Sequence, residues 1–429
     1  MKKTISILLA LVMALSVFSV MALAEETPDI TYEVLSEEEK TCKVTGAKAG
    51  IVDLVIPAEI DGYKVVYIDN RAFWSNKEIE TVQIPDSVER IGQLVFSKTA
   101  LYKNDANWEN DVLYVGKFVI VAKSTLEGEY AIKAGTTVMA DGAFRSCKKL
   151  TKITIPEGMK AISLLAFRDC ETLAEVVFPS TLKSIGSYAF LHCTALKAVT
   201  LPESLEKIGS YSFNDSGLTD VTIPASVKEI DKYAFCHCAD LTAINVAEAN
   251  ENYSSASGIL YNKDKTTVVY VPYKVDYSTF ELPETVTTIG KGAFEGATFE
   301  EFEIPETVTT IENAAFEGCA NLKKVKIPAS VTEIADNAFA KCHAHFVIEA
   351  PEGSYAYSYA LENGYILNGI MGDVTGDGKV TAIDARQILQ CAASNTEFSP
   401  EQIKLADLNG DGKVTAFDAR LALQVAANS

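Results

Sequence analysis

The sharpest chemical signal in the sequence is a pair of acidic segments near the C-terminus. Residues 373–389 read DVTGDGKVTAIDARQIL, and residues 407–423 read DLNGDGKVTAFDARLAL. Each places oxygen-bearing side chains at positions 1, 3, 5, 9 and 12 of a 12-residue loop and glycine at position 6, the spacing by which such a loop wraps a Ca²⁺ ion. These side chains are Asp373, Thr375, Asp377, Thr381 and Asp384 in the first loop and Asp407, Asn409, Asp411, Thr415 and Asp418 in the second.

A solvated acidic turn is the alternative interpretation of a single segment of this kind. Two copies, each followed by an apolar-periodic helix, favour a pair of calcium loops. The chain between them also predicts a helix, because Ser399 is placed to cap it, with Pro400 at its first position and Glu401 in its first turn. So small a domain buries too little to fold alone, and we expect Ca²⁺ to supply the missing stability.

No catalytic constellation stands out elsewhere in the chain. The sequence contains no G-x-S-x-G, no H-E-x-x-H and no glycine-rich phosphate loop, and its many carboxylates form no distinguished pair. Two clusters, residues 236–238 (CHC) and 342–345 (CHAH), suggest zinc as a minor alternative. The four histidines of the chain are His192, His237, His343 and His345.

A period of about 23 residues runs through most of the chain and must supply the scaffold. One unit reads L-x-x-I-x-I-P-x-x-V-x-x-I-x-x-x-A-F-x-x-C, and a fixed period of this length predicts a solenoid whose units bury their apolar sides by stacking. Ile153 and Ile155 predict a short strand, which Pro156 ends because it has no N–H to donate. The repeat phenylalanines are Phe73, Phe96, Phe144, Phe167, Phe190, Phe213, Phe235, Phe294, Phe316 and Phe339.

Most of the cysteines lie three residues after a repeat phenylalanine. Ser216 and Ala297 fill the same position in other units. A position that accepts Cys, Ser or Ala is small and buried, so we expect a column of free thiols rather than disulfides. The column consists of Cys147, Cys170, Cys193, Cys238, Cys319 and Cys342.

The repeat unit resembles the BspA-like leucine-rich repeats of bacterial surface and secreted proteins, over about residues 32–367. The resemblance implies a β-rich repeat solenoid with short turns and helical pieces, which we place at residues 25–367. Breaks in the period near 101–138 and 247–280 predict inserted β-hairpins, the second turning at 262–265. Residues 352–367 predict a helical cap that closes the last unit.

After a linker at 368–371, residues 372–429 resemble a type I dockerin, the small all-α module that plugs a protein into a cohesin on a scaffold. The resemblance implies two Ca²⁺ ions and adds the carbonyls of Lys379 and Lys413 to the ligands above, with Thr381 acting through water. Thr375 replaces the usual Asn or Asp at position 3, so the first site is expected to be the weaker one. The linker is too short for a flexible tether, so the module should sit close to the last repeat.

The same resemblance implies a partner surface on two helix faces. Because the copies are near-identical, either helix can dock after a half-turn of the module. Alternatively, Ile383, Leu389, Phe417 and Leu423 belong partly to the core. The predicted faces are Ala382, Ile383, Arg386, Leu389 and Gln390 in the first copy, and Ala416, Phe417, Arg420, Leu423 and Gln424 in the second.

Three tyrosines are the best candidate for a ligand surface on the repeats. Tyr188, Tyr211 and Tyr233 each lie two residues before a repeat phenylalanine in successive units, so they are expected to form a stacked stripe. The alternative is that they pack against one another at the edge of the core.

The N-terminus and the charge predict an exported, acidic protein. Residues 1–24 read as a signal peptide cut before Glu25, with a membrane anchor as the alternative. No later segment is apolar enough to span a bilayer. The formal net charge of -20 makes nucleic acid an unfavourable partner.

These features together predict a secreted, extracellular component without catalytic activity, held at the cell surface where its scaffold is. Its repeats bind a protein or a glycan, and its dockerin docks onto a cohesin of a cellulosome-like complex. The alternative is an enzyme of polysaccharide breakdown, because most dockerin-bearing chains are glycoside hydrolases. A protease inhibitor or a host-interaction protein is a third option.

Overall fold

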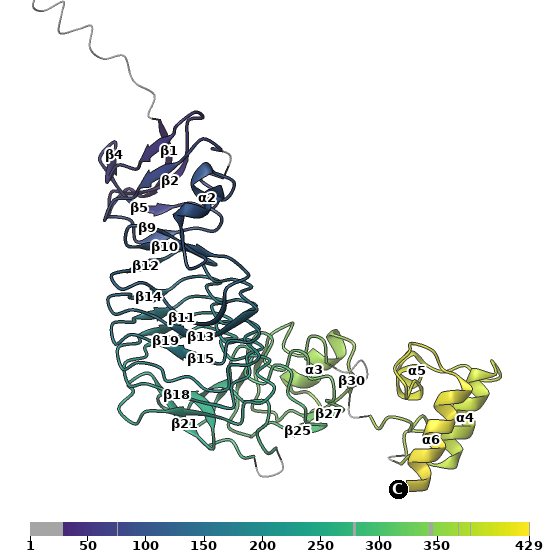
Figure 1. Ribbon diagram of the computed structural model, residues 1–429. Helices are drawn as coiled ribbons and strands as arrows, with labels where there is room; N and C mark the ends of the chain where they lie inside the picture. Colours follow the sequence, from purple (N-terminus) through teal and green to yellow (C-terminus); the bar gives the residue numbers. More distant parts are fainter. Residues whose placement is uncertain are drawn as a thin grey trace, which may run out of the picture. The chain divides into compact units, whose positions relative to one another are not determined.

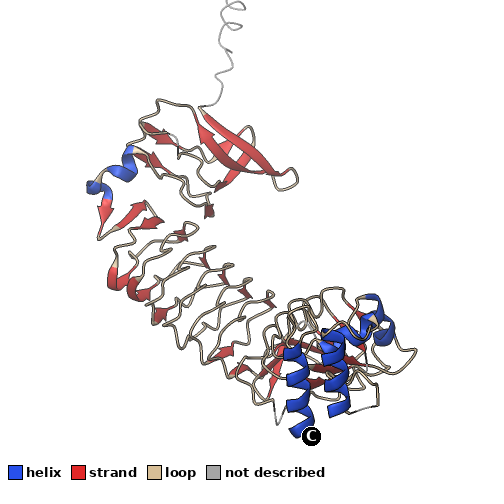
Figure 2. Ribbon diagram, turned by 90° about the vertical axis from the view of Figure 1, so that its right-hand side faces the viewer, coloured by secondary structure: helices blue, strands red, loops and turns tan. Residues whose placement is uncertain are grey.

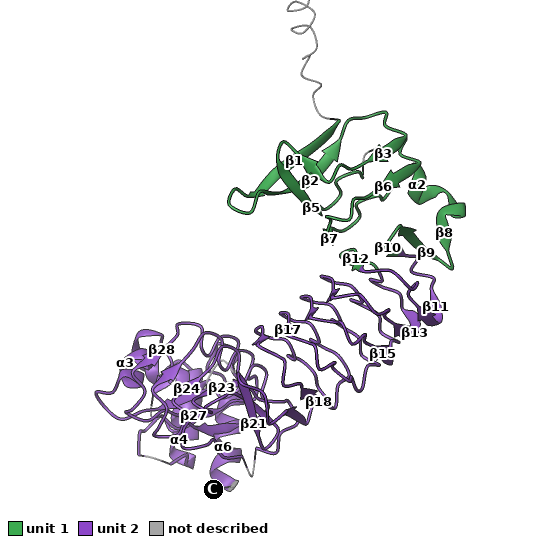
Figure 3. Ribbon diagram, turned by 90° about the vertical axis from the view of Figure 1, so that its left-hand side faces the viewer, with its two compact units in different colours: residues 1–121, 138–143 green, residues 122–137, 144–429 purple. Residues whose placement is uncertain are grey.

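The computed structural model describes residues 29–74, 76–277, 280–342, 346–367, 369–377 and 379–428. The predicted signal peptide, His343, His345 and Gly378 lie outside these ranges. The chain divides into two compact units, residues 1–121 with 138–143 and residues 122–137 with 144–429 (Figure 3). No helix among the described residues is long and apolar enough to cross a membrane.

The first unit consists of an antiparallel entry hairpin followed by short parallel strands from successive repeats. A short helix capped by Thr99 and a second hairpin follow. The elements are β1 (Ile30–Ser36), β2 (Thr41–Ala47), β3 (Asp53–Val55), β4 (Glu59–Ile60), β5 (Tyr63–Ile68), β6 (Thr81–Gln83), β7 (Arg90–Ile91), α2 (Ala100–Lys103), the 3-10 helix η1 (Asp105–Asn107), β8 (Trp108–Glu109), β9 (Val112–Val115), β10 (Phe118–Ala122) and β12 (Val138–Met139).

The second unit holds most of the repeats, and its strands are short and mostly parallel (Figure 2). They are β11 (Glu127–Ala131), β13 (Lys149–Thr154), β14 (Ala161–Ile162), β15 (Glu175–Val177), β16 (Ser184–Ile185), β17 (Lys207–Ile208), β18 (Asp220–Ile223), β19 (Glu229–Ile230), β20 (Ala243–Val246), β21 (Tyr253–Ala256), β22 (Ile259–Asn262), β23 (Thr267–Tyr270), β24 (Thr288–Ile289), β25 (Glu301–Glu303), β26 (Thr310–Ile311), β27 (Lys324–Lys326), β28 (Glu333–Ile334), β29 (Val347–Glu349) and β30 (Ile366–Leu367).

The helices of the second unit all lie in its C-terminal part. The first of them, with Ser354 as its N-cap, packs beside β30 where the repeats end, at the position of the predicted cap. The other three belong to the acidic C-terminal segment. The four helices are α3 (Tyr355–Glu362), which is the cap, and α4 (Ala382–Ala392), α5 (Pro400–Ala406) and α6 (Ala416–Asn428).

The predicted β-solenoid is confirmed by the register of its strands. Ile162, Ile185, Ile208 and Ile230 occupy equivalent positions in the ladder β14-β16-β17-β19. Each unit therefore places the same residue on the same side of the stack, which is what a strict sequence period requires.

The repeat phenylalanines form three stacks of rings, which run from Phe73 to Phe96, from Phe144 to Phe235 and from Phe294 to Phe339. The ring centroids of Phe144 and Phe167 are 5.3 Å apart, those of Phe167 and Phe190 are 5.2 Å apart, and the rings of the second pair are tilted by only 11°. All three side chains are fully buried. The spacing is close to the distance between neighbouring strands, so each ring packs on its equivalent in the next unit.

The cysteine column is also confirmed, because all nine cysteines have free thiols. The thiol of Cys170 donates to the carbonyl of Phe144 at 3.1 Å, and that of Cys193 donates to Phe167 at 3.2 Å. Burial raises the pKa of the Cys147 thiol to about 12. Burial raises the pKa of Cys170 and Cys193 as well, so the thiols of Cys147, Cys170 and Cys193 are structural donors and poor nucleophiles.

Both breaks in the period contain antiparallel hairpins. Strands β8 and β9 pair around Asn110 and Asp111, whose φ angles of 49° and 65° are those of a tight primed turn. In the second break, β22 and β23 pair around 263–266, while β21 and β22 pair around Ser257 and Gly258. This last turn was not predicted from the sequence.

The C-terminal segment folds around two antiparallel helices, α4 and α6, which lie side by side (Figure 1). Ala385, Ile388, Ala419 and Ala422 form its small buried core with residues of the loops. Helix α5 begins as predicted, with Ser399 as the N-cap and proline at the first position. Its Lys404 ammonium donates to the carbonyl of Gly364 in the last repeat at 2.6 Å.

Candidate functional site: the twin acidic loops

The first acidic loop is organised around two buried carboxylates. Asp373 is 4% exposed and Asp384 is 0% exposed. The hydroxyl of Thr375 lies 3.1 Å from Asp373 Oδ1 and 2.8 Å from Asp384 Oδ1. One hydroxyl has a single proton, so it satisfies one of these two oxygens at a time. The loop thus brings the carboxylates at positions 1 and 12 within hydrogen-bonding distance of the same hydroxyl group, that of Thr375.

Backbone amides hold these carboxylates in place. Asp373 Oδ1 accepts from the amides of Gly376 at 2.7 Å and Asp377 at 3.2 Å. Asp384 Oδ2 accepts from both the amide and the hydroxyl of Thr381 at 2.8 Å, which closes a capping box at the start of α4. The helix therefore fixes position 12 of the loop that precedes it.

The second loop repeats this arrangement. Asp407 and Asp418 are 2% and 0% exposed. Asp407 accepts from the amides of Gly410 at 3.0 Å and Gly412 at 2.7 Å, and Asp418 Oδ2 accepts from the hydroxyl of Thr415 at 2.8 Å. Gly412 stands at position 6 with a φ of 80°, the left-handed conformation for which glycine is suited.

The loops differ at position 3. In both loops the backbone amide at position 3 donates to the carboxylate at position 12, at 3.0 Å from Thr375 to Asp384 and at 3.2 Å from Asn409 to Asp418. In place of the Thr375 hydroxyl, however, the Asn409 side chain donates from Nδ2 to Asp411 at 2.9 Å. Its side-chain oxygen accepts from the Asp411 amide at 3.0 Å. The second loop is thus organised by a side-chain amide where the first uses a hydroxyl.

The carboxylates at position 5 engage their own loops. Asp377 accepts from the amide of Lys379 at 3.0 Å, and Asp411 accepts from the amide of Lys413 at 2.9 Å. Within the described ranges, no three His, Cys, Asp or Glu side chains are grouped so that they could hold a metal ion. The predicted ligands are therefore close in the chain and ordered, but the structure does not gather all of them around one point.

The donor set nevertheless fits a hard divalent cation. Each loop holds two buried carboxylates and further oxygen atoms from threonine or asparagine, which is the chemistry that Ca²⁺ prefers. For Asp384, burial favours the neutral acid, but hydrogen bonds from Thr381 and Thr375 outweigh burial and lower its pKa. This carboxylate is therefore kept ionised inside the loop, as a metal ligand must be.

Sequence reasoning missed one residue that supports the first loop. Gln402 of α5 donates to the carbonyl of Val374 at 2.9 Å, while its oxygen accepts from the Ser399 amide at 3.0 Å. The S-x-x-Q spacing of a capping box was present in the sequence and could have identified it.

All ten residues of the predicted partner faces are exposed on α4 and α6. The exposed fractions are 54% for Ile383 and 49% for Leu389 on α4, and 45% for Phe417 and 49% for Leu423 on α6. The alternative that these four side chains are partly core is therefore wrong. The core positions of the helices are filled by smaller residues and Ile388, which leaves the large side chains in solvent.

The tyrosine stripe is present on the repeats. The rings of Tyr188 and Tyr211 are stacked at 5.0 Å with an interplanar angle of 4°, and those of Tyr211 and Tyr233 at 5.0 Å with an angle of 26°. The side chains are half-buried. Because the faces of the rings cover one another, the stripe presents mainly ring edges, as the edge-packing interpretation predicts.

Each of the two histidines that the structure describes lies close to a carboxylate group. His192 Nδ1 lies 2.7 Å from Asp169 Oδ1, and His237 Nε2 lies 3.6 Å from Glu295 Oε1. Cys238 is buried and its thiol donates to the carbonyl of Phe213 at 3.0 Å. These contacts do not gather a zinc ligand set in the described part of the chain.

Comparisons with known proteins agree with this geometry. The family model "BspA type Leucine rich repeat region" matches six copies over residues 58–118, 125–242 and 269–373. The model "Dockerin type I domain" matches residues 371–422. No curated protein matches the chain.

Several solved structures are similar to this chain. A leucine-rich repeat protein from Eubacterium ventriosum is 29% identical with a TM-score of 0.41, and the match covers 52% of this chain and 54% of that one, so only about half of that relative is spanned. One from Bacteroides ovatus is 24% identical with a TM-score of 0.42, covering 81% of this chain and 99% of that one.

The family matches span the two regions in which the repeats and the twin loops were observed. The first match covers more than half of the chain, and the second covers both acidic loops and most of α6. The protein therefore belongs to the BspA-type leucine-rich repeat family and ends in a type I dockerin domain.

Proposed function

We propose that this protein is an exported binding component. Its Ca²⁺-loaded dockerin attaches it to a cohesin of a cellulosome-like scaffold. The single observation that carries the proposal is the duplication of the loop–helix unit. Both copies bury the first and last carboxylates of the loop and expose the same helix face. Neither the repeat family nor the dockerin family is catalytic, which favours binding over polysaccharide hydrolysis.

Two Ca²⁺ ions would be held by the twin loops. The side chains at positions 1, 3, 5 and 12 and the carbonyls of Lys379 and Lys413 would supply oxygen ligands, with Thr381 and Thr415 at position 9. A bound ion supplies positive charge between carboxylates that would otherwise repel each other. The protein itself contributes the capping boxes and amides that keep these carboxylates ionised and oriented.

The two exposed helix faces would be alternative docking surfaces. On each face an aromatic or branched residue, a leucine, an arginine and a glutamine stand at the same helical positions. Arg420 also lies over the ring of Phe417, with its guanidinium carbon 4.7 Å from the ring centroid. Arginine and aromatic side chains of this kind commonly carry much of the binding energy of an interface.

The test uses the full-length protein, a panel of type I cohesins and three variants. These are Ile383→Asp with Leu389→Asp, Phe417→Asp with Leu423→Asp, and all four changes together. All four side chains are exposed, so the fold should survive. Either pair alone should weaken binding by less than about fivefold, whereas the combined variant should lose binding. Complete loss from one pair alone would contradict the two-surface proposal.

The leucine-rich repeats would then present a captured protein or glycan to the scaffold. The proposal includes export because the cohesin partner is extracellular and because the sequence predicts a signal peptide. Incubating the full-length protein with plant polysaccharides and measuring reducing ends tests the non-catalytic role. No increase over a heat-denatured control is expected, and a sustained increase would contradict it.

A further inference from the structure

The hairpin insertion between two repeats interrupts the backbone ladder of the second unit. In regular repeats, the amide of the repeat phenylalanine donates to the following rung, as Phe190 does to Ser212 at 2.7 Å. Among the described residues, the corresponding amide of Phe235 donates to no acceptor. Phe235 is buried, and buried amides without a partner are rare in folded proteins.

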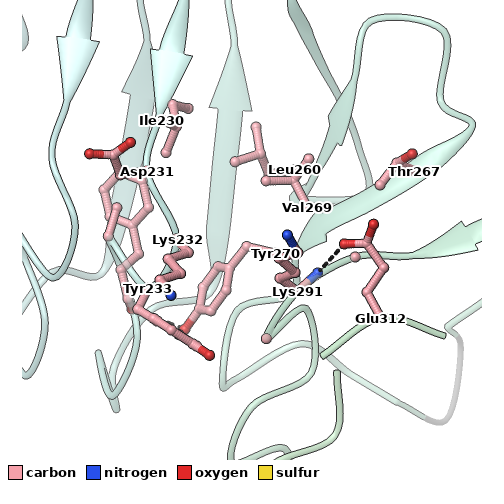
Figure 4. Close-up of a pocket in the computed structure, with 14 residues that line it drawn as sticks. Ile230, Asp231, Lys232, Tyr233, Leu260, Thr267, Val269, Tyr270, Lys291 and Glu312 are labelled. Atoms are coloured by element: carbon pink, nitrogen blue, oxygen red, sulfur yellow. Dashed lines mark hydrogen bonds between the residues drawn. The ribbon is translucent and has the colours of Figure 1, made fainter. Parts of the chain in front are cut away.

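A pocket of about 240 Å³ lies at this interruption. Figure 4 shows Asp231 on one wall, Lys291 and Glu312 on the opposite wall, and Leu260 and Tyr270 between them. Strand β19 ends its ladder here, whereas β23 starts the pairing with β24. The amide of Phe235, whose equivalents in other repeats donate to the next rung, therefore belongs to a residue that lines the pocket.

A glycine allows the ring of Tyr233 to pack at the edge of this pocket. Gly292 stands two residues before Phe294, the repeat position that Tyr233 occupies in the preceding unit. Its φ is 66°, and a Cβ atom there would lie 2.5 Å from Cε1 of Tyr233. The tyrosine stripe therefore ends on the backbone of Gly292, and the Tyr233 ring becomes a wall of the pocket.

The polar groups of the pocket combine donors and acceptors without a net charge. Asp231 and Glu312 supply carboxylates, whereas Lys232 and Lys291 supply ammonium groups. Glu312 Oε2 accepts from the Lys291 amide at 3.1 Å, and Asp231 lies 3.6 Å from the ammonium of Lys207. A balanced set of this kind has no preference for phosphate or another strong anion, which needs an excess of positive charge.

We propose that this pocket binds one sugar ring of a neutral polysaccharide. Hydroxyl groups both donate and accept, so they match the two carboxylates, the two ammonium groups and the amide of Phe235. The apolar side chains of Ile230, Leu260 and Val269 match the C–H faces of a sugar ring. The volume is below the ~300–1,000 Å³ of pockets that enclose drug-sized ligands, so one ring fits rather than several.

The inference rests on the proposed binding role of the repeats and names their ligand class. A peptide segment would need a row of unpaired strand amides to add to the sheet. Strand β19 spans only two residues, and the amide of Ile230 already donates to the hydroxyl of Tyr253 at 2.8 Å. The pocket is therefore better suited to a compact hydroxylated ring than to an extended chain.

The test is calorimetric titration of the full-length protein with cellohexaose, xylohexaose and mannohexaose, and with hexagalacturonate as an anionic comparison. The pocket variants are Asp231→Asn and Lys291→Met. Their matched controls, Asp220→Asn and Lys323→Met, change exposed residues outside the pocket. Circular dichroism checks that each variant folds, and cohesin binding is measured on the same samples.

The wild type should bind at least one neutral hexasaccharide, and each pocket variant should bind it roughly five- to thirtyfold more weakly, as expected for one lost polar contact. The controls should bind like the wild type. The inference is overturned if none of the neutral sugars binds, if hexagalacturonate alone binds, or if the pocket variants keep full affinity. Sugar binding without any cohesin binding would instead count against the docking role alone.

Discussion

At the scale of single residues, the chemistry of the C-terminal domain depends on four buried carboxylates. Asp384 and Asp418 each join an acidic loop to the helix that follows it, because the same side chain closes the loop and accepts from the threonine just before the helix. Sequence spacing identified these residues. It did not identify how Thr375 bridges two carboxylates, because that contact depends on the folded path of the loop.

Replacing either position-12 carboxylate should weaken Ca²⁺ binding at its own loop. For Asp384→Asn and, separately, Asp418→Asn, the loss of a ligand should exceed the ~10–100-fold effect of losing an outer-shell partner. Calorimetric titration with Ca²⁺ should show one remaining site in each variant. Asp377→Asn serves as a milder comparison, and two intact sites in either position-12 variant would contradict the assignment.

His237 should make the stability of the repeats depend on pH. Its pKa is raised above 6.5, first by its side-chain contact with Glu295, even though burial opposes the charge. A raised pKa in the folded state stabilises the protein below the unfolded pKa, and this contribution disappears as the pH rises through the folded value. The melting temperature of the wild type should therefore fall relative to His237→Gln between about pH 6 and pH 8. An unchanged difference across that range would show that the contact contributes nothing.

At the scale of elements, the stacked phenylalanines and the twin helices follow from repetition in the sequence. A period fixes which residues meet in neighbouring rungs, so the ring stack and the thiol column could be predicted. The turn at Ser257 and the pocket beside Tyr233 could not. They depend on which inserted strand replaces a rung, and this is decided by pairing between β23 and β24, far from any local signal.

The ring stack should dominate the stability of the repeats. Phe190→Ala removes a fully buried ring and should lower the free energy of unfolding by about 3–5 kcal/mol. Tyr211→Ala removes a half-buried ring from the outer stripe and should cost clearly less. Urea denaturation followed by circular dichroism measures both. Equal losses would mean that the stripe is as much a part of the core as the phenylalanines.

At the scale of the whole molecule, the protein combines a long repeat surface with a small C-terminal domain that we expect to depend on bound Ca²⁺ for its order. The repeats are stabilised by burial of large side chains along their length. The dockerin buries chiefly alanine, valine and a single isoleucine, so we expect bound Ca²⁺ to supply part of its stability. Chelation should therefore affect the two parts differently.

Adding EDTA should unfold the dockerin and leave the repeats folded. Limited proteolysis should then cut within residues 372–428 while a fragment containing the repeats persists. Restoring Ca²⁺ in excess, but not Mg²⁺, should protect the C-terminal part, because Mg²⁺ demands a tighter octahedral geometry. Identical cleavage with and without EDTA would show that the domain is stable without the ion.

The most direct measurement of the central claim is the Ca²⁺ dependence of cohesin binding by the full-length protein. Titration with a panel of type I cohesins should show a complex of one cohesin per chain in Ca²⁺ and no detectable binding in EDTA, with recovery when Ca²⁺ is restored. Binding of equal strength in EDTA, or no binding to any type I cohesin in Ca²⁺, would contradict the account.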